Sequence, residues 1–362
     1  MSDVAGIVAD VRDRGDAALR DWSERLGDGP PDRLVPRGEL DPSLLDAIRA
    51  LAAAVETVHR AQRPADATVS PLPGIEVTRR WLPVDSVGIY VPSGLVSSLV
   101  MTAVPARVAG VKRIAVATPR PSEAMLAAAC ELGIDELYSM GGAQAIAALA
   151  YGTETIDPVA KIVGPGSRWV TEAKLLVSSR VAIDLPAGPS EVLVIADETA
   201  DPDECASDLL AQAEHGPDGD SALLTTSTDL AVAVSARVGD RARVEVVPSL
   251  NEAVARANDQ GPEHLELLVA DPEGLAAGIR NAGAVFLGTT AVVGDYAAGS
   301  NHVLPTGGLA RAVGGLGLEA FLKPVQFVSV TTAALATVRP TVEALAKAEG
   351  LPLHAESVAV RG

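Results

Sequence analysis

Two side chains near residue 212 raise the first question of chemistry. In LLAQAEHGPDGDS, residues 209–221, Gln212 and His215 stand about one helical turn apart, before a Gly-Pro pair that would end a helix. A helix directs such side chains to one face, where they could bind a metal ion such as zinc. Glutamine is an uncommon zinc ligand, however, and a lone histidine near a helix end is more often structural or a partner of the helix dipole. Both interpretations stay open on this stretch alone.

The five histidines of the chain differ in their surroundings. His59, in ETVHRAQRP, lies on a charged helical pattern and is expected at the surface. The other four have carboxylates, Gly or Pro beside them, and none lies in a plain amphipathic run: His215, His264, His302 and His354. Asp295 and His354 could complete a zinc site, but spacing alone does not select them from 47 acidic residues.

Glu263 and His264 are adjacent and follow Pro262 at the entrance of a predicted strand. Two neighbouring titratable groups can divide acid and base roles if their environments push their pKa values apart. The alternative is an exposed turn before a strand.

Two Gly-rich turns could meet a phosphate group. IVGPGSRWVTEA reads as a strand, a turn and a helix, and GGAQAIAALA is similar. No G-x-G-x-x-G follows a strand, and turns of this kind also serve as simple strand-to-helix connections.

Short β-branched strands alternate with amphipathic helices through most of the chain, and residues 3–26 and 41–62 have helical spacing. The alternation predicts an α/β fold of two Rossmann-like lobes with mostly parallel sheets. The expected division groups 1–89 with 191–316 in the first lobe and gives 90–190 to the second. Residues 317–362 are expected to form a C-terminal helix and a tail that ends extended. The polar, Gly-rich loop at 296–311 is where function tends to sit.

Composition narrows the classes of protein. With a formal charge of −18 and 3% aromatic residues, the chain lacks the basic face and stacking side chains of a nucleic-acid binder. No uninterrupted apolar run is long enough for a membrane span, and the N-terminus has no signal-peptide pattern. Cys130 and Cys205 lie in apolar helical patterns and are expected in the core. A soluble cytoplasmic protein is expected.

Nine short motifs, taken in their order along the chain, resemble those of a known enzyme family. In chain order they are MTAVPARVAGV, GGAQAIAALAYGTETI, KIVGPG, DLPAGPSEVLVIAD, LAQAEHGPD, GPEHLEL, NAGAVFLG, GDYAAGSNHVLPTGG and EGLPLHAESV. Together these segments resemble the histidinol dehydrogenase family, from about residue 7 to the C-terminus. As a set they are far more specific than any single Gly-rich turn.

The resemblance implies a zinc- and NAD-dependent enzyme of histidine biosynthesis. It would oxidise L-histidinol to L-histidine through an aldehyde, passing two hydrides to two NAD molecules. Carried over by motif, Glu263 and His264 are the catalytic pair. The implied zinc ligands are Gln212, His215, Asp295 and His354. The implied substrate-binding positions are Ser190, Gln212, His215, His264, Asp295, Glu349 and His354, and the NAD-binding positions are Tyr90, Gln144 and Ser167.

The resemblance also implies roles for these residues. His264 would take the hydroxyl proton, and Glu263 would activate the water that hydrates the aldehyde. In the family the C-terminal tail reaches into the partner's active site, so a homodimer is expected in which Glu349 and His354 complete the site. Glu349 would anchor the substrate ammonium or hold the tail in register. His302 would have a supporting role at most.

Some positions depart from the family pattern. Ser167 stands in GPGSRW where the family usually has Asn, the YVPSGLVSSLVM loop is short, and the family's leading N-terminal arm is missing. These departures leave two alternatives. One is a zinc- and NAD-dependent dehydrogenase of another small alcohol. The other is a non-catalytic, metal-binding paralogue, against which the intact Glu263–His264 pair argues.

Overall fold

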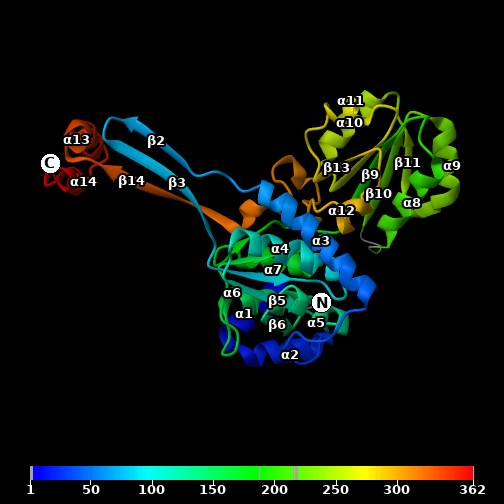
Figure 1. Ribbon diagram of the computed structural model, residues 1–362, viewed down its shortest axis with the longest axis horizontal. Coiled ribbons are helices and arrows are strands. Elements are labelled where there is room, and N and C mark those ends of the chain that lie inside the picture. Colours follow the sequence, from blue (N-terminus) through cyan, green and yellow to red (C-terminus); the bar gives the residue numbers. More distant parts are fainter. Residues whose placement is uncertain (1–2, 187, 215, 217–218, 362) are drawn as a thin grey trace. The chain divides into compact units, whose positions relative to one another are not determined.

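The computed structural model describes residues 3–186, 188–214, 216 and 219–361. The chain divides into two compact units (Figure 1). Unit 1 comprises residues 1–62 and 84–321, and unit 2 comprises residues 63–83 and 322–362. Unit 1 contains two sheets with helices packed on them, which confirms the predicted pair of α/β lobes.

The first sheet has the strand order β1-β6-β5-β4-β7-β8. All neighbours are parallel except the edge pair β1 and β6. Because β4 lies between β5 and β7, the chain changes direction across the sheet at β4, and ligands of parallel α/β sheets bind at such a switch point. The strands are β1 (Arg33–Leu34), β4 (Ser86–Tyr90), β5 (Arg113–Thr118), β6 (Glu136–Ser139), β7 (Lys161–Val163) and β8 (Ala182–Ile183).

Helices with apolar faces bury this sheet. The first helix, α1, places Val4, Ile7, Val8 and Val11 at helical spacing in a core shared with the alanine-rich α6. Asp3 caps α1 by accepting the Ala5 N–H. The helices of this lobe are α1 (Val4–Arg14), α2 (Asp16–Leu26), α3 (Pro42–Ala61), α4 (Val96–Ala109), α5 (Glu123–Glu131), α6 (Gly142–Tyr151) and α7 (Arg168–Val177).

The N-terminal segment belongs to this first sheet. Residues 1–89 were expected to group with 191–316, but β1 and β4 pair with strands from 90–190, and α1 shares the core of α6 and α7. The physical reason is the pairing of β4: its residues are buried on both faces between β5 and β7, a position that hydropathy does not assign to either lobe.

The second sheet is wholly parallel, with the order β11-β10-β9-β12-β13. Its central strand β9 alternates between two cores: Val192 and Val194 face one, and Leu193 and Ile195 face the other. The strands are β9 (Glu191–Ala196), β10 (Asp220–Thr225), β11 (Arg243–Val246), β12 (His264–Leu268) and β13 (Ala284–Leu287). The helices are α8 (Pro202–Ala213), α9 (Thr228–Val238), α10 (Leu250–Gln260), α11 (Pro272–Ala276) and α12 (Val292–Tyr296). Short 3-10 turns occupy Gly239–Arg241, Leu309–Arg311 and Leu318–Phe321.

Unit 2 is a separate antiparallel structure. Strand β3 (Ile75–Pro83) pairs with β2 (Ala67–Leu72) on one side and, along its whole length, with β14 (Leu322–Val330) on the other. Helices α13 (Thr332–Ala348) and α14 (Pro352–Ala359) follow. The prediction of an extended end was wrong, because Pro352 begins a helix. Strand β14 was not predicted, and its partner lies more than two hundred residues away along the chain.

Two details correct or extend the sequence analysis. Cys205 is buried as expected, but Cys130 is exposed on α5, so its assignment to the core was wrong; both thiols are free. Within the described residues, no helix combines the length and apolar character that a membrane span needs.

Candidate active site

The predicted catalytic pair lies at the amino edge of the second sheet, beside Ser190. Glu191 begins β9 and His264 begins β12, and these two strands are neighbours. The opposite wall comes from the carboxyl edge of the first sheet, through the loops after β4 and β7. Ligands of α/β sheets usually bind at carboxyl edges, which only the first lobe supplies here.

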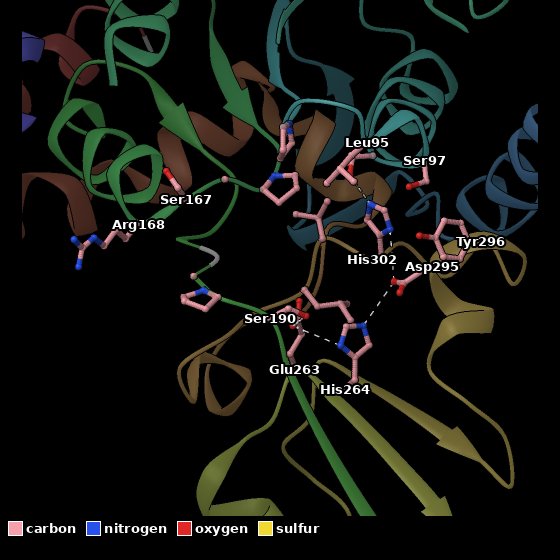
Figure 2. Close-up of a pocket in the computed structure, with 18 of the residues that line it drawn as sticks. Leu95, Ser97, Ser167, Arg168, Ser190, Glu263, His264, Asp295, Tyr296 and His302 are labelled. Atoms are coloured by element: carbon pink, nitrogen blue, oxygen red, sulfur yellow. Dashed lines mark hydrogen bonds and ion pairs between the residues drawn. The ribbon is translucent and has the colours of Figure 1, made fainter. Parts of the chain in front are cut away.

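Between these edges lies a cavity of about 800 Å³. Figure 2 shows that its wall includes the adjacent Glu263 and His264 together with Asp295 and His302, which come from other segments. Its wall also includes these residues: Pro92, Leu95, Ser97, Ser98, Pro165, Gly166, Ser167, Arg168, Trp169, Gly188, Pro189, Ser190, Tyr296, Val303 and Leu304. Most of the polar groups lie on the side of the second lobe.

The His264 ring has a defined orientation. Its Nδ1 lies 3.1 Å from the main-chain oxygen of Glu191 and 3.5 Å from Glu263 Oε2. A carbonyl oxygen can only accept, so Nδ1 carries the hydrogen and Nε2 keeps its lone pair in the neutral ring. Nε2 faces Asp295 Oδ1 at 3.9 Å (Figure 2). The ring therefore presents a basic nitrogen toward the cavity.

Neighbouring carboxylates tune His264. Burial opposes its charged form, but hydrogen bonding to Glu263 and the charges of Glu263 and Asp295 outweigh burial and raise the pKa of His264 above its ordinary value. Glu263 is itself held by the Ser190 hydroxyl at 2.7 Å and the Glu191 N–H at 2.8 Å, both donating to Oε2. The pair is thus buried and oriented, which excludes the exposed turn that the sequence left open.

Asp295 lies between two histidines. Besides facing His264, its Oδ1 lies 3.6 Å from Nδ1 of His302, whose Nε2 lies 3.0 Å from the Ser98 hydroxyl. Asp295 comes from α12 and Ser98 from α4, so His302 links the two lobes at the cavity. Ser98 was not predicted; it lies in an apolar helix where nothing in the sequence distinguishes it.

Hydrogen bonds of the buried Asn301 hold the turn that carries His302. Asn301 has φ 40° and is buried, and its amide donates to the Met101 oxygen at 2.7 Å. The same amide lies 3.4 Å from Nε2 of His59, whose Nδ1 donates to the Val55 oxygen. The prediction of a surface position for His59 was wrong: it is fully buried, and burial lowers its pKa.

Gln212 ends α8 with its amide buried beside Ser190. The Ser190 hydroxyl has one hydrogen, which the shorter contact with Glu263 takes, while Gln212 Oε1 lies 3.4 Å away. The amide therefore faces Ser190 best with its NH₂ group, since the two ends of a glutamine amide are interchangeable in shape. Its oxygen then occupies the buried position of Nε2, which has no hydrogen-bond partner within the described chain.

The predicted metal ligands are distributed over both units and the residues that the structure does not describe. Gln212 and Asp295 belong to unit 1, His215 lies outside the described residues, and His354 is exposed on α14 of unit 2. Among described residues, no three His, Cys, Asp or Glu side chains converge as a metal cluster. The buried amide of Gln212 and the carboxylate of Asp295, which lines the cavity, are nonetheless oxygen donors that a divalent cation accepts.

A second cavity of about 360 Å³ lies at the switch point of the first sheet. It contains Tyr90 and Ser167 of the predicted nucleotide-binding set, with Asp28 and Trp169, which were not predicted. Gln144 is fully buried and donates through Nε2 to Asp28 Oδ2 at 2.9 Å, while its Oε1 has no partner in the described structure. The remaining lining residues are Val4, Ile7, Leu26, Pro119, Gly142 and Ala143.

Ser167 and Trp169 line both cavities, so the two spaces adjoin. The turn before Ser167 is rigidly held. Gly164, at φ 110°, lies so close to Tyr90 that an added Cβ would be 2.1 Å from the Tyr90 oxygen. Its N–H donates to Asp184 at 2.7 Å, and buried Lys174, paired with Asp184, donates to the Gly164 oxygen at 3.0 Å.

Glu349 belongs to unit 2. It caps the C-terminal end of α13 in unit 2 and is exposed there. Its predicted contact with a substrate stays a prediction.

Comparison with known proteins identifies the family. The model of the histidinol dehydrogenase family matches residues 1–362. Histidinol dehydrogenases of Rhizobium meliloti and Rhodopseudomonas palustris are 45% and 44% identical, covering 99% and 98% of this chain and 91% of each relative. The crystal structure of histidinol dehydrogenase from Elizabethkingia anophelis superposes with a TM-score of 0.90 at 35% identity, covering 100% of this chain and 92% of the other. A probable aldehyde dehydrogenase from Listeria monocytogenes shares the fold alone, with a TM-score of 0.53 at 11% identity over 91% of each chain. The chain therefore belongs to the histidinol dehydrogenase family, which makes it an oxidoreductase.

Proposed function

We propose that this protein oxidises L-histidinol to L-histidine through the aldehyde, in two successive hydride transfers, each to one NAD. The observation that carries the proposal is the orientation of His264, whose Nδ1 is bound to the Glu191 oxygen while Nε2 faces the cavity. A fixed neutral imidazole beside a carboxylate is suited to removing a hydroxyl proton. When bound, NAD would accept the hydride, and zinc would hold the substrate's imidazole and amine in place.

The residues of the chain divide the work between the two half-reactions. His264 takes the alcohol proton on Nε2 as the carbon–hydrogen bond is broken. Glu263 then accepts a proton from the water that adds to the aldehyde carbon, giving the hydrate for the second oxidation. Ser190 and the Glu191 N–H stabilise the Glu263 carboxylate meanwhile. Because Ser190 and Glu191 precede or begin β9, both donors stand on a rigid element.

The metal would be held by Gln212, His215, Asp295 and His354. The unpartnered amide position of Gln212 and the carboxylate of Asp295 support this assignment. We propose that the protein is a homodimer, in which the partner subunit's Glu349 and His354 complete each site. Unit 2 exposes large apolar side chains that a partner would cover: Val69, Val328, Leu345, Leu353 and Val360.

The cavity at the switch point is the proposed location of NAD. Its place at the carboxyl edge of a parallel sheet is where dinucleotides bind in such folds. Tyr90 and Ser167 contribute polar groups, and Gln144 holds the lining Asp28 from behind. Ser167 and Trp169 line both this cavity and the one that contains His264. The charge of −18 is consistent with small-molecule partners rather than nucleic acid. The cytoplasmic location remains a prediction.

The decisive experiment is a histidinol assay that counts NADH with and without a chelator. Two NADH per histidinol, loss of activity on chelation and recovery with zinc are expected. One NADH per substrate, or full activity without metal, would exclude the proposal. His264→Asn should lower turnover by at least ~100-fold while leaving bound metal unchanged.

The alternative of another small alcohol is favoured by one observation, the Ser167 substitution on the wall of both cavities. A panel of alcohols at fixed NAD separates the two functions. Turnover of another alcohol with none of histidinol would establish the alternative.

A further inference from the structure

Two carboxyl groups, one buried and one half-buried, lie close to the site, and the proposed mechanism uses neither of them. Glu266 is 1% exposed on β12, two residues after His264, and Asp208 lies on α8, one turn before Gln212. Glu266 Oε1 accepts the Ala291 N–H at 2.6 Å. Its Oε2 is sealed from solvent, and within the described residues no N–H or O–H donor reaches it.

The carboxyl of Asp208 approaches that of Glu266, and Thr290 lies close to Asp208. Two carboxylates cannot bond to each other because neither has a hydrogen, so the pair must share one proton. Burial and the charge of Asp208 raise the pKa of Glu266 to about 8, and burial raises the pKa of Asp208. The other titratable groups that act on the pair are Cys205, a neutral thiol whose pKa burial raises to about 12, and His264.

A cation could in principle replace the shared proton. The described residues provide no third His, Cys, Asp or Glu to complete a metal cluster there. A single shared proton satisfies both carboxyl groups without the additional ligands that a metal ion would need, as in other pairs of neighbouring carboxyl groups.

The pair connects the three elements that carry the site. Glu266 and His264 share one face of β12, since strand side chains alternate. Asp208 and Gln212 share one face of α8. Thr290 and Ala291 lead directly into α12, where Asp295 lies one turn later. A bond at Ala291 therefore sets the position of Asp295 relative to the strand that carries His264.

We propose that Glu266 is a positioning residue whose buried carboxyl, sharing a proton with Asp208, ties α8 and β12 to the first turn of α12 and so sets the spacing of Gln212, His264 and Asp295. The inference rests on the proposed function, because it gives those three residues their roles. The contact it maintains is the 3.9 Å approach of His264 Nε2 to Asp295 Oδ1. Displacement of such groups by about 1 Å can reduce kcat/KM on the order of 100-fold.

The test compares two substitutions of Glu266. Glu266→Gln keeps an oxygen for the Ala291 N–H and supplies an amide donor to Asp208, so kcat/KM should stay within about threefold of wild type. Glu266→Leu removes both bonds, and kcat/KM should fall about 10- to 100-fold, through a higher KM for histidinol with the KM for NAD unchanged. Glu204→Gln, an exposed carboxyl on the same helix as Asp208, is the matched control and should match wild type.

The outcomes separate the two levels of inference. A wild-type protein that does not oxidise histidinol overturns the proposed function. A folded Glu266→Leu protein with wild-type KM values, or a Glu266→Gln protein as impaired as Glu266→Leu, overturns the positioning role. If Glu266→Leu does not fold by circular dichroism, Asp208→Leu replaces it. That change removes the carboxyl that shares the proton with Glu266, and an unaltered KM for histidinol would then overturn the role.

Discussion

His264 Nδ1 lies 3.1 Å from the main-chain oxygen of Glu191, so the His264 ring is oriented by the backbone of a neighbouring strand. No substitution of a side chain at position 191 can remove this acceptor. The pairing of β9 with β12 therefore determines which nitrogen of His264 carries the hydrogen, because it places the Glu191 oxygen beside Nδ1. Glu263 adds charge to this arrangement and thereby controls the basicity of the ring.

The first prediction concerns that control. Glu263 contributes to the raised pKa of His264, and the base must be neutral to act, so activity should appear as pH rises through this pKa. Glu263→Gln removes the charge, and the acidic limb of the rate profile should move to lower pH. The first NADH formed per site should be measured by rapid mixing, since the second half-reaction also needs Glu263. Glu273→Gln, an exposed carboxyl, is the control; an acidic limb that stays in place would contradict the role of Glu263.

A second prediction concerns Ser167. Its hydroxyl makes no capping hydrogen bond to α7, although it stands at the N-cap position. Ser167→Asn restores the residue usual in the family, with a longer arm and both donor and acceptor groups. The KM for NAD should fall about three- to tenfold while the KM for histidinol is unchanged. Ser178→Asn at the other end of α7 should change neither constant; an unaltered or higher KM for NAD in Ser167→Asn would remove Ser167 from the nucleotide site.

A third prediction concerns His59. His59→Ala removes a fully buried ring, and with it the partner of the Asn301 amide. This change should lower the free energy of unfolding by about 2–4 kcal/mol. Because burial lowers the pKa of His59 below that of the unfolded chain, wild-type stability should fall as pH drops below about 6.5. Urea unfolding at pH 5.5 and 7.5 measures both effects. The exposed Thr57→Ala on the same helix should change stability little, and equal losses in the two variants would refute the buried role.

A fourth prediction follows from the Asp208–Glu266 pair. The folded protein keeps a proton on Glu266 that the unfolded chain releases near its ordinary pKa of 4.5, and the folded value is about 8. Between these values the folded state binds more protons, so its stability should decline as pH rises through this window. Glu266→Gln should flatten that decline by on the order of 2 kcal/mol. Thermal melting at pH 5 and pH 8 for both proteins is the measurement, and identical pH dependence would show that no proton is shared.

Much of the fold could be predicted from residue patterns. The periodicity of apolar residues within each strand or helix is a local property of the sequence. The alternation of strands and helices, and hence two parallel α/β lobes, was therefore predictable. The assignment of β4 and the N-terminal helices was not, because which sheet a strand joins depends on pairing with distant strands. For the same reason β14, with Pro324 in its sequence, was not predicted.

The sequence by itself determined which chemistry is available. Adjacent Glu263 and His264, and Gln212 near the end of a capped helix, are local features whose residue types suit the roles proposed for them. The ordered motifs determined the family.

Only the tertiary structure decided how these groups face one another. It placed the Glu191 oxygen at His264, buried His59 beneath Asn301, joined Gln144 to Asp28 and brought Glu266 to Asp208. Each of these contacts joins segments distant in the chain, across sheet edges and loop ends. Their geometry depends on how strands pair and helices pack, so it cannot be predicted from the spacing of residues along the sequence.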